Sequence, residues 1–99
     1  DIETAVRAQT PITTVLLHNS GMATYPGGFP TAREQYGVSN MHGNYAPIAQ
    51  GMGAVGIVVR TPEEMSDALR SAQRLNQDSD TVLIDVHSDM EGRRSRWDR

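Results

Sequence analysis

The chain has 99 residues, a formal net charge of −3 at pH 7 and no cysteine. This length allows one small domain, the weak negative charge excludes a general attraction to nucleic acid or anionic lipid, and the missing cysteines exclude disulfides and thiolate metal sites. No apolar run reaches the length of a membrane span and the sequence shows no signal peptide, so we expect a soluble protein of the cytoplasm.

In residues 2–9, side chains that recur at a spacing of three or four positions predict a short helix with one inner face. Its predicted inner face consists of Ile2, Ala5, Val6 and Gln9. Pro11 marks the end of this helix, and the apolar and β-branched run 12–17 predicts a buried parallel strand. A helix followed closely by a parallel strand is half of a right-handed crossover. We therefore expect its first strand upstream of residue 1 and interpret the chain as the carboxyl-terminal piece of a larger protein.

The segment 21–43 follows no single periodicity, and prolines and paired glycines at 26–30 exclude regular structure there. Residues 31–36 predict a short helix that ends at Gly37. Two interpretations of residues 25–43 stay open. Either the segment covers a ligand site, with Tyr25 and Phe29 as wall residues, or it is a surface loop anchored by one buried aromatic side chain.

The second half of the chain alternates helices and strands. A helix begins after Asn44 as its N-cap and ends before Gly53, and the apolar run 54–59 predicts the second strand. The helix presents one apolar face, predicted to contain Tyr45, Ile48, Ala49 and Met52.

Thr61-Pro62-Glu63-Glu64 is the clearest local signal, since it combines an N-cap threonine, a proline in the first turn and a glutamate that reaches back to the cap. The helix behind it has an apolar face, predicted to contain Met65, Ala68, Leu69, Ala72 and Leu75. Residues 81–86 predict the third strand, which contains Asp85. This order predicts an α/β fold: a three-layer fragment with three parallel strands and crossover helices.

The turn His18-Asn19-Ser20-Gly21 follows the first strand directly. Ligand sites of open α/β sheets lie beyond the carboxyl ends of such strands. The Asn19 side chain and the Gly21 carbonyl, which no Cβ shields, offer two neutral oxygens of the kind that magnesium binds together with phosphate. The turn therefore predicts a magnesium site.

With the elements around it, this turn resembles the closing half of the cofactor-binding motif of thiamine-diphosphate-dependent enzymes, most closely their acetolactate-synthase-like and 2-oxo-acid-decarboxylase-like branch. In that family a Gly-Asp-Gly opens the motif and an Asn-Asn-x-Gly type turn closes it. The resemblance implies that residues 1–88 are the carboxyl-terminal part of a thiamine-diphosphate (pyrophosphate-binding) domain, without the upstream Gly-Asp-Gly. Residues 89–99 are then a carboxyl-terminal arm.

The resemblance also implies the cofactors, thiamine diphosphate and Mg²⁺, and the residues that hold them. The metal ligands are the Asn19 side chain and the Gly21 carbonyl. The implied cofactor-binding residues are Asn19, Ser20, Gly21, Met22, Ala23 and Thr24. His18 stands where the family usually has its first asparagine, so that position's contacts do not carry over.

A member of this family acts on a 2-oxo acid by decarboxylation, carboligation or both. The glutamate that activates the cofactor comes from another domain of a neighbouring subunit, and the first magnesium aspartate lies upstream. The resemblance therefore implies the remaining domains of a parent chain and a homodimer or homotetramer as partners, with no catalytic residue among these 99 and no turnover by them alone. Neither nucleic acid nor membrane is implied.

Two alternatives to this enzyme fragment stay open: a non-catalytic α/β binding or assembly module, and an unrelated phosphate- or nucleotide-binding α/β domain that shares only the topology.

Other combinations of reactive residues are less specific. His18, Ser20 and Asp85 are the residue types of a hydrolase triad, but no Gly-x-Ser-x-Gly elbow surrounds the serine. The histidines at 18, 42 and 87 lack the short spacing of zinc ligands, so we interpret them as ordinary hydrogen-bonding or surface residues. The arginines beside Trp97 are interleaved with acids and indicate a solvated arm.

Overall fold

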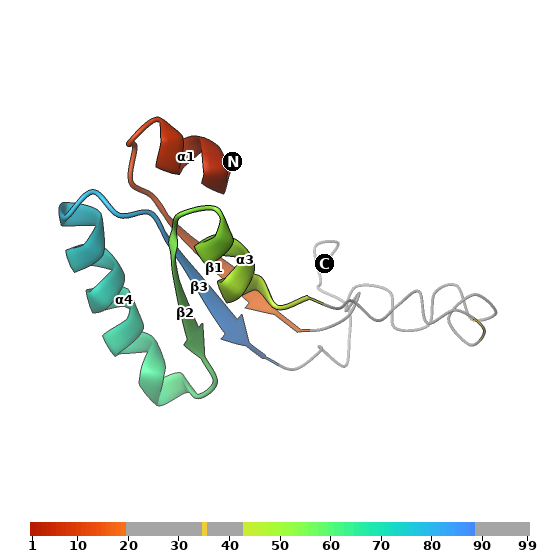
Figure 1. Cartoon of the computed structure of the whole chain (residues 1–99). Helices are drawn as coiled ribbons and strands as arrows, with labels where there is room; N and C mark the ends of the chain where they lie inside the picture. The colour runs from red at the N-terminus through yellow and green to blue at the C-terminus, as the bar shows by residue number, and fades with distance from the viewer. Residues whose placement is uncertain (20–34, 36–42, 89–99) are drawn as a thin grey trace, which may run out of the picture. The chain divides into compact units, whose positions relative to one another are not determined.

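The computed structural model describes residues 1–19, 35 and 43–88 (Figure 1). Asp1–His18 and Asn44–His87 form one compact unit. Its elements are α1 (Ile2–Arg7), β1 (Thr13–His18), α3 (Tyr45–Gly51), β2 (Val55–Val59), α4 (Pro62–Gln77) and β3 (Val82–His87). In the second unit, Asn19–Gly43 with Ser88–Arg99, the described residues are Asn19, Gln35, Gly43 and Ser88. The helix predicted for 31–36 and the segment 25–43 therefore lie almost wholly outside the described residues.

The three strands of the first unit form one parallel sheet in the order β1-β3-β2. The arrowheads in Figure 1 point the same way, so the carboxyl ends of all three strands lie at one edge. There His18 of β1 is paired with His87 of β3, and Val59 of β2 is paired with Val86. This arrangement confirms the predicted α/β class with a parallel sheet.

Each face of the sheet packs against helices, which gives the three layers of the fold (Figure 1). On one face, α4 contributes Ala68 and Ala72 to an apolar cluster that contains Val82 and Ile84 of the central strand. On the other face, Ala49 of α3 packs with Ala54 and Leu83, and the partly buried residues Ile2, Val6 and Tyr45 pack against them. Because β3 is central, its residues form the middle of both clusters.

All three described helices of this unit end with the same backbone arrangement, the Schellman motif. The residue after each C-cap has a positive φ angle: Gln9 (56°), Gly53 (92°) and Ser79 (69°). The following amide donates to a carbonyl five residues earlier: Thr10 to Ala5, Ala54 to Ala49, and Asp80 to Leu75. The placement of Gln9 on the inner face of the first helix was therefore wrong, because this residue lies beyond the helix and is exposed.

The buried face of α3 also differs from the prediction. Ala46 and Ala49 are buried, whereas Ile48 and Met52 are 49% and 42% exposed. The reason is the close approach of α3 to β2 at Gly56, where a Cβ would lie 2.6 Å from the carbonyl oxygen of Ala46. Only small side chains fit at this contact.

Helix α4 starts as predicted and packs almost as predicted. Both hydrogen bonds of a capping box join Thr61 and Glu64. Ala68 and Ala72 face the sheet and Met65 and Leu75 flank them, but Leu69 is 45% exposed. Ala68 and Ala72 form the part of α4 that lies closest to the strands, and Leu69 lies at the margin of this face.

Candidate functional site

The carboxyl ends of β1 and β3 bring two histidines and an aspartate together. His18 and His87 end their strands as register partners, and Asp85 lies two residues before His87. Side chains two residues apart in a strand point to the same face, so all three lie on the face covered by α3. The side chain of Asp85 is 1% exposed, that of His18 9% and that of His87 33%.

The two oxygens of Asp85 have different surroundings. Nδ1 of His18 donates a hydrogen bond of 2.9 Å to Oδ1 of Asp85. Oδ2 lies 3.5 Å from Nε2 of His87; it is buried and has no hydrogen-bond partner in the described part of the chain. The carboxylate therefore orients the His18 ring through one oxygen and leaves the other unsatisfied.

Ring contacts hold the His18 imidazole from two sides. The ring of Tyr45, from the first turn of α3, meets it edge to face at a centroid distance of 5.0 Å. The His87 ring lies at 4.7 Å with an interplanar angle of 44°. Since Nδ1 donates the hydrogen bond to Asp85, Nε2 is the nitrogen of neutral His18 that can accept a hydrogen bond or bind a metal ion.

The structure also locates the start of the predicted magnesium turn. Asn19 follows the last residue of β1 and is half-buried. Its neutral amide oxygen, at the end of a parallel strand, is a suitable ligand for magnesium. The other predicted site residues, Ser20, Gly21, Met22, Ala23 and Thr24, lie outside the described residues, as does the serine of the triad that the sequence analysis considered.

Sequence reasoning treated the histidines as scattered and missed their meeting with Asp85. His18 and Asp85 are separated by 67 positions, and His42 lies outside the described residues. One signal pointed to the cluster. His18 and His87 each directly follow a strand predicted to be parallel, and the Asp85-x-His87 alternation places the aspartate and histidine on one face if that strand continues to His87.

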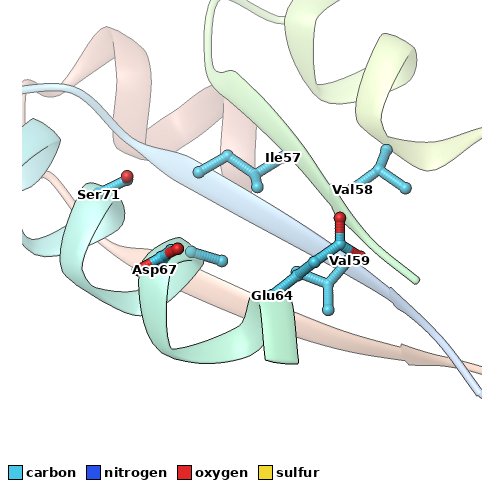
Figure 2. A pocket seen from close by; sticks show the side chains of 7 residues that line it. Ile57, Val58, Val59, Glu64, Asp67 and Ser71 are labelled. Atoms are coloured by element: carbon cyan, nitrogen blue, oxygen red, sulfur yellow. The ribbon is translucent and has the colours of Figure 1, made fainter. Parts of the chain in front are cut away.

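A shallow hollow of about 280 Å³ lies between β2 and the first half of α4 (Figure 2). It is lined by Ile57, Val58, Val59, Glu64, Asp67, Ala68 and Ser71. Its two ionisable side chains are carboxylates, and that of Glu64 already accepts hydrogen bonds from the backbone amides of Arg60 and Thr61. An acidic lining repels phosphate groups, so this hollow is a poor candidate for an anionic ligand.

Among the described residues, no helix combines the length and apolar character needed to cross a bilayer.

A comparison with known families identifies a match over most of the chain. The family model described as "Thiamine pyrophosphate enzyme, C-terminal TPP binding domain" matches residues 1–86. The match covers all three strands except His87, the last residue of β3, and it includes residues 18–21. No curated protein matches the chain.

Proposed function

Because the chain belongs to the family of C-terminal TPP-binding domains of thiamine pyrophosphate enzymes, we propose that it binds the cofactor's diphosphate through Mg²⁺ in an enzyme acting on 2-oxo acids. The family match over residues 1–86 carries this proposal. The magnesium ion and the substrate class rest in addition on the turn His18-Asn19-Ser20-Gly21 and on its resemblance to acetolactate-synthase-like and 2-oxo-acid-decarboxylase-like enzymes.

In this proposal the Asn19 side chain and the Gly21 carbonyl bind the magnesium ion. The amides of the next residues, Met22, Ala23 and Thr24, face the diphosphate, and Ser20 belongs to the same turn. The end of β1 at His18 supports the assignment, because it leaves Asn19 as the first residue beyond a parallel strand. Neutral oxygen ligands also suit an ion whose charge is largely balanced by diphosphate.

When bound, thiamine diphosphate supplies the nucleophilic carbon and the electron sink for decarboxylation. The residues of this chain hold the diphosphate and so orient the reactive part of the cofactor toward the substrate. The resemblance assigns the activating glutamate to another domain of a neighbouring subunit, in a homodimer or homotetramer, and the magnesium aspartate to the Gly-Asp-Gly half of the motif. The outcome, release of an aldehyde or ligation to a second carbonyl compound, then depends on those parts.

Calorimetric titration of the full-length protein with thiamine diphosphate, with and without Mg²⁺, tests the proposal. We expect binding that requires Mg²⁺ and that Asn19→Ala weakens by about tenfold or more, since a metal ligand is lost. Gln77→Ala is the matched control, because it removes an exposed amide at the far end of α4 and should leave the affinity unchanged.

Three outcomes would contradict the proposal in different ways. Unchanged affinity in the Asn19→Ala variant would remove this residue from the site. Normal cofactor binding without turnover of any 2-oxo acid would identify a non-catalytic binding module. Absence of cofactor binding would leave an α/β domain that shares only the fold of the family.

A further inference from the structure

We propose that His18, Asp85 and His87 form a binding site for a transition-metal dication of the Zn²⁺ type, separate from the proposed magnesium site. All three residues lie in the unit that contains the sheet, and each offers one ligand atom within 4.8 Å of the others. Two of the three side chains come from the central strand β3 and the third from its neighbour β1, so the backbone hydrogen bonds of the sheet hold them in place.

The distance between His87 and Asp85 suits a shared ion better than a hydrogen bond. Zinc binds nitrogen and oxygen at about 2.0–2.2 Å, so two ligands of a tetrahedral ion lie roughly 3.4 Å apart. Nε2 of His87 and Oδ2 of Asp85 are 3.5 Å apart, which is long for a hydrogen bond but appropriate for two ligands of one ion. His18 offers a ring nitrogen within 4.8 Å of the other two ligand atoms. If Nδ1 is the ligand atom, its bond to the ion replaces the hydrogen bond that it donates to Oδ1 of Asp85.

The buried carboxylate provides the electrostatic reason. Oδ2 of Asp85 has no exposed surface and no hydrogen-bond partner among the described residues. A buried carboxylate oxygen without a partner is unfavourable, and Nε2 of His87 lies 3.5 Å from this one. A dication bound at Oδ2 supplies the missing partner.

The ligand types determine which ion binds. Two imidazoles and one carboxylate favour Zn²⁺ and related transition-metal ions, whereas Mg²⁺ prefers oxygen ligands. The partly exposed side chain of His87 gives the site access to solvent, so water can fill a fourth position. The bound ion would also join the carboxyl ends of β1 and β3.

Cobalt substitution tests the site directly. Metal-free full-length protein is titrated with Co²⁺ in excess Mg²⁺ and without thiamine diphosphate, followed by visible absorption, and then with Zn²⁺ by calorimetry. We expect one ion per chain and a visible spectrum typical of tetrahedral coordination. Asp85→Asn and His87→Gln should each weaken binding by about tenfold or more.

Matched controls separate ligand loss from unfolding. Asp67→Asn makes the same change as Asp85→Asn on the exposed surface of α4 and should leave the Co²⁺ affinity unchanged. His87→Gln lies at the end of a strand and is partly exposed, so it should keep the native circular dichroism even where Asp85→Asn does not. Co²⁺ binding that survives His87→Gln in the folded protein, or the absence of stoichiometric binding, would overturn the proposal.

One further variant distinguishes this proposal from the proposed function. Asn19→Ala should reduce the affinity for thiamine diphosphate and leave Co²⁺ binding intact. If it abolishes Co²⁺ binding as well, there is one metal site and not two, and the proposal is overturned. If cofactor binding is absent but Co²⁺ binds as described, the cluster is confirmed and the proposed function fails.

Discussion

At the scale of single residues, three positions with positive φ angles end the helices of the sheet-containing unit. Gly53 suits such a position, and a side chain there would also meet Val6, since a Cβ would lie 3.0 Å from its Cγ1. Gln9 and Ser79 adopt the left-handed conformation with a Cβ present, which is unfavourable for L-residues. Each therefore contributes local strain at a point where a helix turns toward a strand.

Replacing Ser79 with glycine should relieve this strain. We expect Ser79→Gly to raise the free energy of unfolding by about 0.5–1 kcal/mol. The free energy gained by removing the strain of the left-handed conformation exceeds the entropic cost of ordering a glycine. Urea unfolding of the full-length protein measures the change. Ser71→Gly, inside α4, is the control and should lower the stability by roughly 0.5 kcal/mol; an equal loss in both variants would contradict this explanation.

The element with the clearest sequence signal is α4, and its first turn depends on a carboxylate. Oε1 of Glu64 accepts hydrogen bonds from the backbone amides of Arg60, at 2.8 Å, and Thr61, at 2.9 Å. These amides stabilise the charged form and lower the pKa of Glu64 below its ordinary value. The helix start is therefore coupled to the ionisation of this side chain.

This coupling predicts a pH-dependent contribution to stability. Because the pKa of Glu64 is lower in the folded than in the unfolded chain, its contribution is fully present above the ordinary glutamate pKa. It is lost as the pH falls through the lowered value. The difference in unfolding free energy between the native protein and Glu64→Gln should therefore shrink on acidification.

Denaturant unfolding at a series of pH values measures this difference. Glu63→Gln is the control, because it removes the same charge from the same turn without removing the capping-box side chain. If the two variants show the same pH profile, the effect belongs to the general field at the helix start and not to the capping box.

At the scale of the whole molecule, the sheet-containing unit leaves apolar surface on its edge strand. Val15 and Leu17 of β1 are 42% and 72% exposed. They lie on the same face of the sheet as their β3 partners Ile84 and Val86, which pack on the α4 side. Exposed apolar residues on an edge strand favour pairing or packing with further structure. No observation tests the prediction that the fold contains a further parallel strand. If it does, elements packed beside that strand would also cover Val15 and Leu17.

The resemblance assigns no catalytic residue to the 99 positions, which gives a prediction for the chain by itself. We expect the isolated 99-residue chain to show no turnover of 2-oxo acids in the presence of thiamine diphosphate and Mg²⁺. The resemblance assigns the activating glutamate to another domain, so the cofactor would lack its activating group in the isolated chain. Release of carbon dioxide from pyruvate and longer 2-oxo acids measures the activity; turnover above a heat-denatured control would disprove the assignment.

Much of the fold was predictable because local signals specify it. Helical spacing and helix caps predicted the three helices of the sheet-containing unit, and continuous apolar runs predicted its three strands. The predicted ends lie within one or two residues of those observed. The predictions of a buried helix face failed at Gln9, Ile48, Met52 and Leu69, all of which are exposed. In each case helical spacing marked a face, but the depth of packing depends on a neighbouring element, as the contact of Ala46 with Gly56 shows.

The sequence by itself determined the order of the elements and the parallel α/β class, because helix caps, periodicity and turn residues act over a few positions. Only the tertiary structure decided the strand order β1-β3-β2 and the meeting of His18, Asp85 and His87. Both depend on hydrogen bonding between strands far apart in the chain, and no local pattern specifies which strands become neighbours or in which register they pair.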